Sequence, residues 1–323
     1  MTVIIAPDSF KGTFTASEVA SAIASGVRAG GVDATEVPLA DGGEGTLAAL
    51  AGPMSLEPVT TTATGPWGET LDVGYGIAAD GTVVIESARI IGLHVPSTGA
   101  RDPLLASTRG VGELIADAVK RGATGVVLAL GGSATSDGGM GAISAIDDLI
   151  GQLEVPITLL TDVTNGYLDA ATVFAPQKGA NERQVALIQE RLISLAAGLP
   201  RDPRSVEGAG AAGGLAGGLW ARYDASIESG ARYVIERSGI AGRADIDVLV
   251  TGEGCLDGQS RHGKLVSGVL KAARGRPVHA VVGSIGTDVG VFLEEFSSVT
   301  TAPDLPEMHA AGLRIAEAVL NGS

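Results

Sequence analysis

Residues 3–23 read VIIAPDSFKGTFTASEVASAI, and this stretch sets the pattern of the chain. The apolar run 3–6 is typical of a buried strand. A helix is predicted to follow, because Thr15 and Glu18 have the spacing of a capping box and apolar residues then recur every fourth position. Strand, loop and helix in this order form the repeating unit of a parallel sheet covered by helices.

The same alternation returns near the end of the chain. Strands are predicted at 246–251, 278–282 and 298–301, and a terminal helix from about 307. From about 56 to 92 the pattern is different, with β-rich runs and the hairpin dipeptide Asp80-Gly81. The outer parts of the chain therefore resemble each other, and the middle does not.

This pattern predicts an α/β protein in which a Rossmann/flavodoxin-like parallel-sheet domain is interrupted by an inserted second α/β domain. We expect the first domain to contain residues 1–58 and 240–323, and the inserted domain to contain residues 59–239. In such sheets ligands bind beyond the carboxyl ends of the strands.

Composition restricts the class of protein. The formal charge of −15, from 22 basic and 37 acidic residues, argues against a nucleic-acid partner, which needs a basic surface. The single cysteine, Cys255, fits a reducing compartment, and neither a signal peptide nor a membrane span is predicted. We therefore expect a cytoplasmic protein without a membrane partner. The oligomeric state stays open, with a homo-oligomer among the alternatives.

Glycine, hydroxyl or carboxylate residues follow each of five predicted strands. These segments share one sheet edge if the strands are parallel, which favours a ligand site over ordinary turns. They are residues 7–12 (PDSFKG), 41–45 (DGGEG), 131–135 (GGSAT), 162–165 (DVTN) and 252–254 (GEG).

Lysine gives an independent indication. The chain has five lysines against seventeen arginines, and Lys11, Lys178 and Lys264 lie beside glycine in loop-like segments. A lysine next to a glycine-rich turn supplies a point charge where backbone N–H groups can also approach an anion. With carboxylates able to hold Mg²⁺, these lysines predict a phosphate site.

Other motifs leave alternatives open. GQSRHGK (258–264) has the spacing of a P-loop up to its lysine but lacks the following hydroxyl residue, and GAGAAG (208–213) is not preceded by a strand. GGSAT approaches the nucleophile elbow of α/β serine hydrolases, with Ser133 as nucleophile. A third alternative is a two-domain anion-binding protein without catalysis.

Five segments together resemble the bacterial glycerate kinases of the first type. They occur in order between residues 5 and 264 as IAPDSFKGTFTASEVASAI, PLADGGEGT, LALGGSATSDGGMGA, FAPQKGA and VLVTGEGCLDGQSRHGK. The resemblance implies an interrupted Rossmann- or flavodoxin-like domain with its active site between the domains. It also implies transfer of the ATP γ-phosphate to D-glycerate, most often at the 2-hydroxyl, with ATP and Mg²⁺ as cofactors.

Site roles follow as hypotheses, because phosphoryl transfer mainly requires positioning and charge neutralisation. Asp41 or Asp8 would accept the proton of the substrate hydroxyl, and Lys11 and Lys264 would face the γ-phosphate or the substrate carboxylate. Asp162 and Glu253 are candidate Mg²⁺ ligands. Ser9, Lys11, Glu44 and Arg101 are candidate substrate contacts. The candidate contacts of the nucleotide phosphates are Gly131, Gly132, Ser133, Ala134, Thr135, Asp137 and Lys178.

The chain departs from the family pattern in three places. Only about 15 residues (143–156) separate the GGSATSDGGMGA segment from the next strand. Gly166-Tyr167-Leu168 follows DVTN where the family has a different turn, and Arg109 stands where the family often has an aromatic residue.

Overall fold

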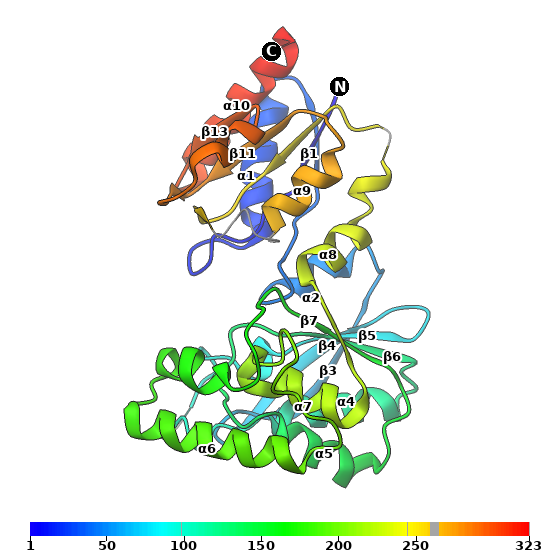
Figure 1. The fold of residues 1–323 in the computed structure, drawn as a ribbon. Coiled ribbons are helices and arrows are strands. Elements are labelled where there is room, and N and C mark those ends of the chain that lie inside the picture. The colour runs from blue at the N-terminus through cyan, green and yellow to red at the C-terminus, as the bar shows by residue number, and fades with distance from the viewer. Residues whose placement is uncertain (98, 244, 259–264, 323) are drawn as a thin grey trace. The chain divides into compact units, whose positions relative to one another are not determined.

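The computed structural model describes residues 1–97, 99–243, 245–258 and 265–322, and the chain forms two compact units (Figure 1). Unit 1 contains residues 1–41, 48–53 and 231–323, and unit 2 contains residues 42–47 and 54–230. Unit 2 is thus an insertion in the chain of unit 1. The borders predicted from the sequence, 58/59 and 239/240, lie a few residues farther along the chain.

Unit 1 is built on one five-stranded sheet with helices on both sides (Figure 1). Its elements are β1 (Thr2–Ile5), α1 (Ala16–Ala29), β2 (Asp33–Glu36), α8 (Gly230–Ser238), β9 (Val248–Thr251), β10 (Cys255–Leu256), α9 (Leu265–Ala273), β11 (Val278–Val282), β12 (Ser284–Ile285), β13 (Ser298–Thr301), α10 (Leu305–Asn321) and the 3₁₀ turns Ile240–Gly242 and Gly290–Glu295. The short helix α2 (Thr46–Ala51) crosses from the unit 2 segment into unit 1.

The strand order of this sheet is β13-β11-β9-β1-β2, and every pair is parallel. Numbered within the unit, the order is 2-1-3-4-5, which is the flavodoxin-like arrangement. The order reverses between β1 and β9, so this is the switch point where ligands bind in such folds. The predicted fold class is confirmed, and the topology selects flavodoxin over Rossmann.

Helices α1 and α10 lie side by side against one face of the sheet (Figure 1). Their backbones approach so closely that a Cβ atom on Gly26 would lie 2.0 Å from the carbonyl oxygen of His309, and one on Gly312 would lie 2.2 Å from that of Ile23. Glycine is therefore required where the two helices cross. The predicted capping box of Thr15 and Glu18 is confirmed at the start of α1.

Replacing Gly26 by alanine should destabilise unit 1, because the added methyl group meets a main-chain oxygen that cannot turn aside. We expect Gly26→Ala to cost about 1–3 kcal/mol and to lower the midpoint of thermal unfolding followed by circular dichroism. Gly198, at the end of a helix of unit 2, has no atom within 4 Å of the position of its Cβ, so Gly198→Ala is the matched control. A Gly26→Ala midpoint equal to that of the control would contradict the packing described.

Unit 2 contains a six-stranded mixed sheet of order β3-β4-β5-β6-β7-β8. The pairs β3–β4 and β4–β5 are antiparallel, and those from β5 to β8 are parallel. Its elements are β3 (Glu57–Thr64), β4 (Thr70–Ile77), β5 (Thr82–Glu86), α3 (Ala88–Ile91), α4 (Arg109–Lys120), β6 (Gly125–Ala129), α5 (Met140–Ile150), β7 (Ile157–Leu160), a π turn (Ala170–Phe174), 3₁₀ turns (Pro176–Lys178 and Ala211–Gly214), α6 (Glu182–Gly198), α7 (Leu215–Tyr223) and β8 (Ser226–Glu228).

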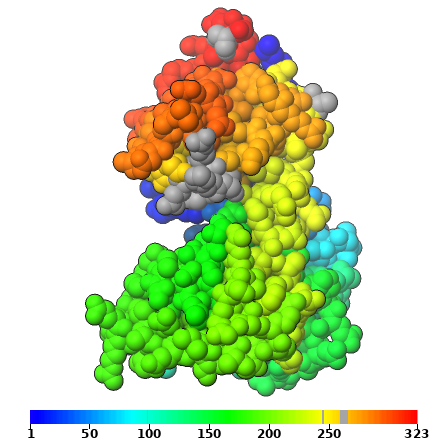
Figure 2. All heavy atoms as spheres, viewed as in Figure 1, coloured from blue at the N-terminus to red at the C-terminus, as the bar shows by residue number. Residues whose placement is uncertain are grey.

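Helices α4, α5 and α7 cover one face of this sheet and share its apolar core (Figure 1). Helix α6 buries only one stripe, Ile188, Leu192 and Ala196, and its other side is at the surface (Figure 2). The hairpin expected at Asp80-Gly81 is confirmed between β4 and β5, with Gly81 at φ +85°.

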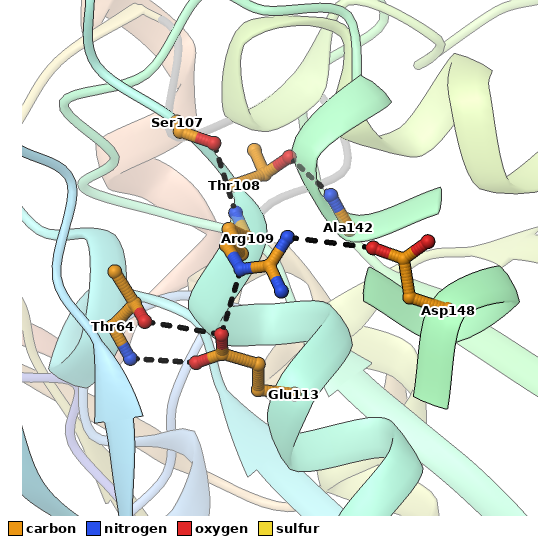
Figure 3. A network of polar contacts seen from close by, with 7 residues as sticks. All are labelled: Thr64, Ser107, Thr108, Arg109, Glu113, Ala142 and Asp148. Carbon is orange, nitrogen blue, oxygen red and sulfur yellow. Dashed lines mark hydrogen bonds and ion pairs between the residues drawn. The ribbon is translucent and has the colours of Figure 1, made fainter. Parts of the chain in front are cut away.

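A polar network joins β3, α4 and α5 (Figure 3). Arg109 Nε donates to Glu113 at 2.9 Å, and its Nη1 lies 3.7 Å from a carboxylate oxygen of Asp148. Glu113 also accepts from the backbone and the hydroxyl of Thr64. Arg109, one of the departures from the family pattern, therefore holds helices together.

The set of elements predicted from the sequence was incomplete, because helix α5 was not predicted. Strands β11 and β13 have the predicted bounds. In the part of the chain that the structure describes, no helix has the length and apolarity needed to cross a membrane.

Candidate active site

A polar cavity lies at the switch point of the unit 1 sheet. Residues that follow all five strands line it, most of them from the loops after β1 and β9, where the backbone N–H of Asp8 donates to the carbonyl of Gly252 at 2.8 Å. Its volume is about 530 Å³. Its polar lining comes mainly from Asp8, Ser9, Lys11, Asp41, Glu253 and Ser284.

Three carboxylates and one ammonium group share this cavity. Lys11 Nζ lies 2.7 Å from a carboxylate oxygen of Asp41, with the lysine side chain 71% exposed and the aspartate 26% exposed. Burial and the nearby carboxylates of Asp41 and Glu253 raise the pKa of Asp8 to about 7. The ammonium group of Lys11 and the N–H of Ser9 lower it, but by less. The loss of water around Lys11 lowers its pKa, but Asp41 outweighs this and the net shift is upward. Asp8 thus exchanges a proton near neutral pH, and Lys11 stays charged.

Gly252 makes this arrangement possible. A Cβ atom there would lie 1.9 Å from the carbonyl oxygen of Val281 on the neighbouring strand, so no side chain fits. The chain can therefore turn directly after β9 and bring Glu253 to the cavity beside Asp8.

The proton on Asp8 predicts a dependence of stability on pH. Because the pKa is raised in the folded protein, the folded state binds more protons between about pH 4 and 7, and stability falls as the pH rises through this window. Asp8→Asn removes the titration, so its unfolding midpoint should rise relative to that of the wild type from pH 4 to pH 8. The control Asp33→Asn changes an exposed carboxylate and should show no such trend. Parallel midpoint curves for Asp8→Asn and wild type would refute the raised pKa.

In unit 2, the loop 131–139 connects β6 to α5. The buried carboxylate of Asp137 accepts hydrogen bonds from the N–H and hydroxyl of Thr108, at 2.8 and 2.9 Å, and from the N–H groups of Gly139 and Gly141, both at 3.1 Å. The protein thus caps the start of α5 with its own anion. Asp137 shapes the loop, and its oxygens point to protein groups.

Lys178 reaches this loop from a 3₁₀ turn of the same unit. Its Nζ donates to the hydroxyl of Ser133 at 3.1 Å and to the carbonyl of Thr135 at 2.5 Å. Burial lowers the pKa of Lys178 to about 8, and Asp137 acts in the opposite direction. We call the adjoining cavity, of about 210 Å³, the Lys178 pocket; it is lined mainly by Leu93, Gly132, Ser133, Val163, Phe174 and Lys178.

Glu86 was missed by the sequence analysis. It ends β5, is 4% exposed, and accepts from the N–H groups of Gly45 and Leu47 at 3.0 and 3.1 Å. It therefore holds the segment 42–47 within unit 2. There Gly43 packs against Gly131, because a Cβ atom on Gly131 would lie 2.7 Å from the Cα of Gly43. The one indication in the sequence was its position, since Glu86 is an acidic residue at the end of an otherwise apolar strand.

Comparisons with known proteins identify the family of the chain. The model of the glycerate kinase family matches residues 3–150 and 146–321. The chain belongs to the glycerate kinase family. The glycerate 2-kinase of Escherichia coli K12 is 35% identical over 353 aligned positions, which cover 95% of this chain and 93% of the relative. The glycerate kinase of Bacillus subtilis 168 is 36% identical, covering 89% and 86%.

A solved structure extends the likeness to three dimensions. The crystal structure titled as glycerate kinase 2 from Salmonella typhimurium LT2 matches with a TM-score of 0.83 and 30% identity, over 100% of this chain and 99% of that chain. This chain is accordingly an ATP-dependent phosphotransferase of the glycerate kinase family.

Within this glycerate kinase, the sequence-predicted site residues form two groups. Asp8, Ser9, Lys11, Asp41 and Glu253 meet at the unit 1 cavity, and Gly131, Gly132, Ser133 and Lys178 meet at the Lys178 pocket. Glu44 is exposed on the 42–47 segment. Lys264 lies outside the described residues.

Other predicted contacts have structural partners. Arg101 donates to the carbonyls of Leu93 and Val95 at 2.8 and 3.1 Å, so its guanidinium fastens the loop after α3. Ala134 is buried, and its N–H donates to the carbonyl of Ile91. The hydroxyl of Thr135 donates to the carbonyl of Ala212.

The hydrolase alternative finds no support in this family or in the geometry. The described partner of the Ser133 hydroxyl is Lys178, whereas His279 and His309 lie in unit 1 and bond to Ser298 and Ser25. His262 lies outside the described residues. Tyr167, at a departure from the family pattern, donates to the carbonyl of Gly138 at 3.2 Å and so supports the glycine loop.

Proposed function

We propose that this protein transfers the γ-phosphate of ATP to the 2-hydroxyl of D-glycerate and releases 2-phosphoglycerate and ADP. The observation that carries the proposal is the group of Asp8, Lys11, Asp41 and Glu253 in one cavity at the switch point of a flavodoxin-like sheet. The names of the relatives support the substrate, and that of the Escherichia coli protein supports the 2-hydroxyl.

The charges of the unit 1 cavity suit phosphoryl transfer. Such transfer needs positive charge on the transferring oxygens and a group that accepts or orients the hydroxyl proton. Lys11 supplies the charge, because Asp41 keeps it protonated. Asp8, with a pKa of about 7, is matched to proton exchange near neutral pH, and Asp41 is the second candidate for this role.

The donor atoms of the cavity also fit Mg²⁺. This ion takes one or two carboxylates and completes its coordination with phosphate oxygens and water. We propose that Glu253 and a neighbouring carboxylate of unit 1 hold it. Asp162, the other Mg²⁺ ligand predicted from the sequence, accepts a hydrogen bond from the hydroxyl of Ser229 at 2.9 Å. Among the described residues, no three His, Cys, Asp or Glu side chains form a complete metal site, so the nucleotide phosphates would supply the remaining ligands. Bound Mg²⁺ would neutralise phosphate charge.

The reaction is tested by its product. The full chain, incubated with MgATP and D-glycerate, should give the ³¹P resonance of 2-phosphoglycerate and one equivalent of ADP. The same incubation with L-glycerate is the control for the configuration of the substrate. Formation of 3-phosphoglycerate would refute the regiochemistry, and ADP formation that does not depend on glycerate would refute the substrate.

The role of Asp41 is tested by Asp41→Asn. The substitution removes a proton acceptor and the ion pair of Lys11, so glycerate-dependent kcat should fall by about 10²-fold or more. The measurement is steady-state ADP release at saturating MgATP, with the exposed Asp33→Asn as matched control. If Asp41→Asn stays within a few-fold of the wild type while remaining folded, Asp41 does not act in proton transfer.

A further inference from the structure

We infer that the Lys178 pocket binds the carboxylate of the hydroxy-acid substrate, and that the nucleotide phosphates belong to the unit 1 cavity. The inference rests on the proposed function. It reverses the expectation from the sequence, in which the loop 131–139 and Lys178 bind the nucleotide.

The first argument is the chemistry of Lys178. An ammonium group has three N–H donors, and the described partners of Lys178 take two of them, the neutral oxygens of Ser133 and Thr135. The remaining donor and the hydroxyl of Ser133 lie at a cavity with apolar walls from Leu93, Val163 and Phe174. A charge beside apolar walls acts at a lower dielectric constant than in water, so one carboxylate is bound strongly.

The second argument is the cap of α5. A glycine-rich loop that binds a nucleotide presents the free N–H groups of a helix N-terminus to the phosphates. Here Asp137 accepts from Gly139 and Gly141, and the hydroxyl of Thr108 accepts from Ala142. These N–H groups are therefore already bonded within the protein and are not presented to a phosphate, whereas a carboxylate bound at Lys178 needs none of them.

The third argument is size. Pockets that enclose drug-sized ligands have volumes of about 300–1,000 Å³. The Lys178 pocket, with about 210 Å³, is below this range, and the unit 1 cavity, with about 530 Å³, is within it. D-glycerate is far smaller than a nucleotide and fits the smaller pocket.

The fourth argument is the charge of the unit 1 cavity. Its one described lysine, Lys11, already pairs with Asp41, and Asp8 and Glu253 add further acidic groups. The charged groups of the described residues in this cavity would together repel a substrate carboxylate. Phosphates that arrive with a divalent cation are attracted to the same carboxylates, because the cation needs them as ligands.

The test separates the two substrates by binding and by kinetics. Isothermal titration calorimetry of the full chain gives Kd values for D-glycerate and for MgADP, and steady-state assays give KM for D-glycerate and MgATP. We expect Lys178→Met to weaken D-glycerate in both measurements by about ten- to a hundredfold, as for the loss of a hydrogen bond to a charged group. The nucleotide values should stay within about twofold. Lys120→Met, which changes an exposed lysine of the same unit, is the matched control.

A second variant guards against misfolding of the loop. Ser133→Ala keeps the lysine and removes one neutral hydroxyl, and it should weaken D-glycerate by about three- to tenfold. Weaker nucleotide binding with unchanged D-glycerate binding in the two variants would overturn the inference, and so would unchanged binding of both ligands in folded protein. If the wild type forms no phosphoglycerate at all, the proposed function fails independently of these variants.

Discussion

The backbone of unit 1 at the β1–β9 boundary determines where the polar side chains of the candidate site gather. Parallel pairing makes both strands end at the same sheet edge. The hydrogen bond from the N–H of Asp8 to the carbonyl of Gly252 then holds the loops that follow the two strands side by side. The reversal of strand order leaves room between the following loops. Acidic side chains from distant parts of the sequence are thereby held together, and burial together with these neighbouring acids raises the pKa of Asp8. The unusual acid thus follows from topology before any particular side-chain contact.

The sequence predicted those parts of the molecule that depend on local pattern. The alternation of strands and helices, the capping box of Thr15 and the hairpin at Asp80-Gly81 were all recognisable, since each is set by residues close together in the chain. The membership of Lys11, Asp41 and Glu253 in one cavity was also predictable, because parallel strands bring their carboxyl ends to one edge.

The sequence could not predict the partners of buried polar groups. Asp137 lies in a glycine-rich loop and was predicted to contact a ligand. Its carboxylate instead accepts a hydrogen bond from Thr108, which lies 29 positions earlier in the chain. Arg101 likewise turns to two carbonyls, and Glu86 bonds across about 40 positions to the segment 42–47. Such choices depend on which loops meet after packing, and a pattern of residue types does not contain that information.

The two described lysines of the candidate sites show how one charge can be used in two ways. Lys11 is exposed and paired with Asp41, so its positive charge is largely balanced within the protein. Lys178 bonds to neutral oxygens and loses water, which lowers its pKa to about 8. An anion that binds there restores the favourable environment of the ammonium group. Burial and the lack of a hydrogen-bonded acid among its described partners therefore distinguish Lys178 from Lys11.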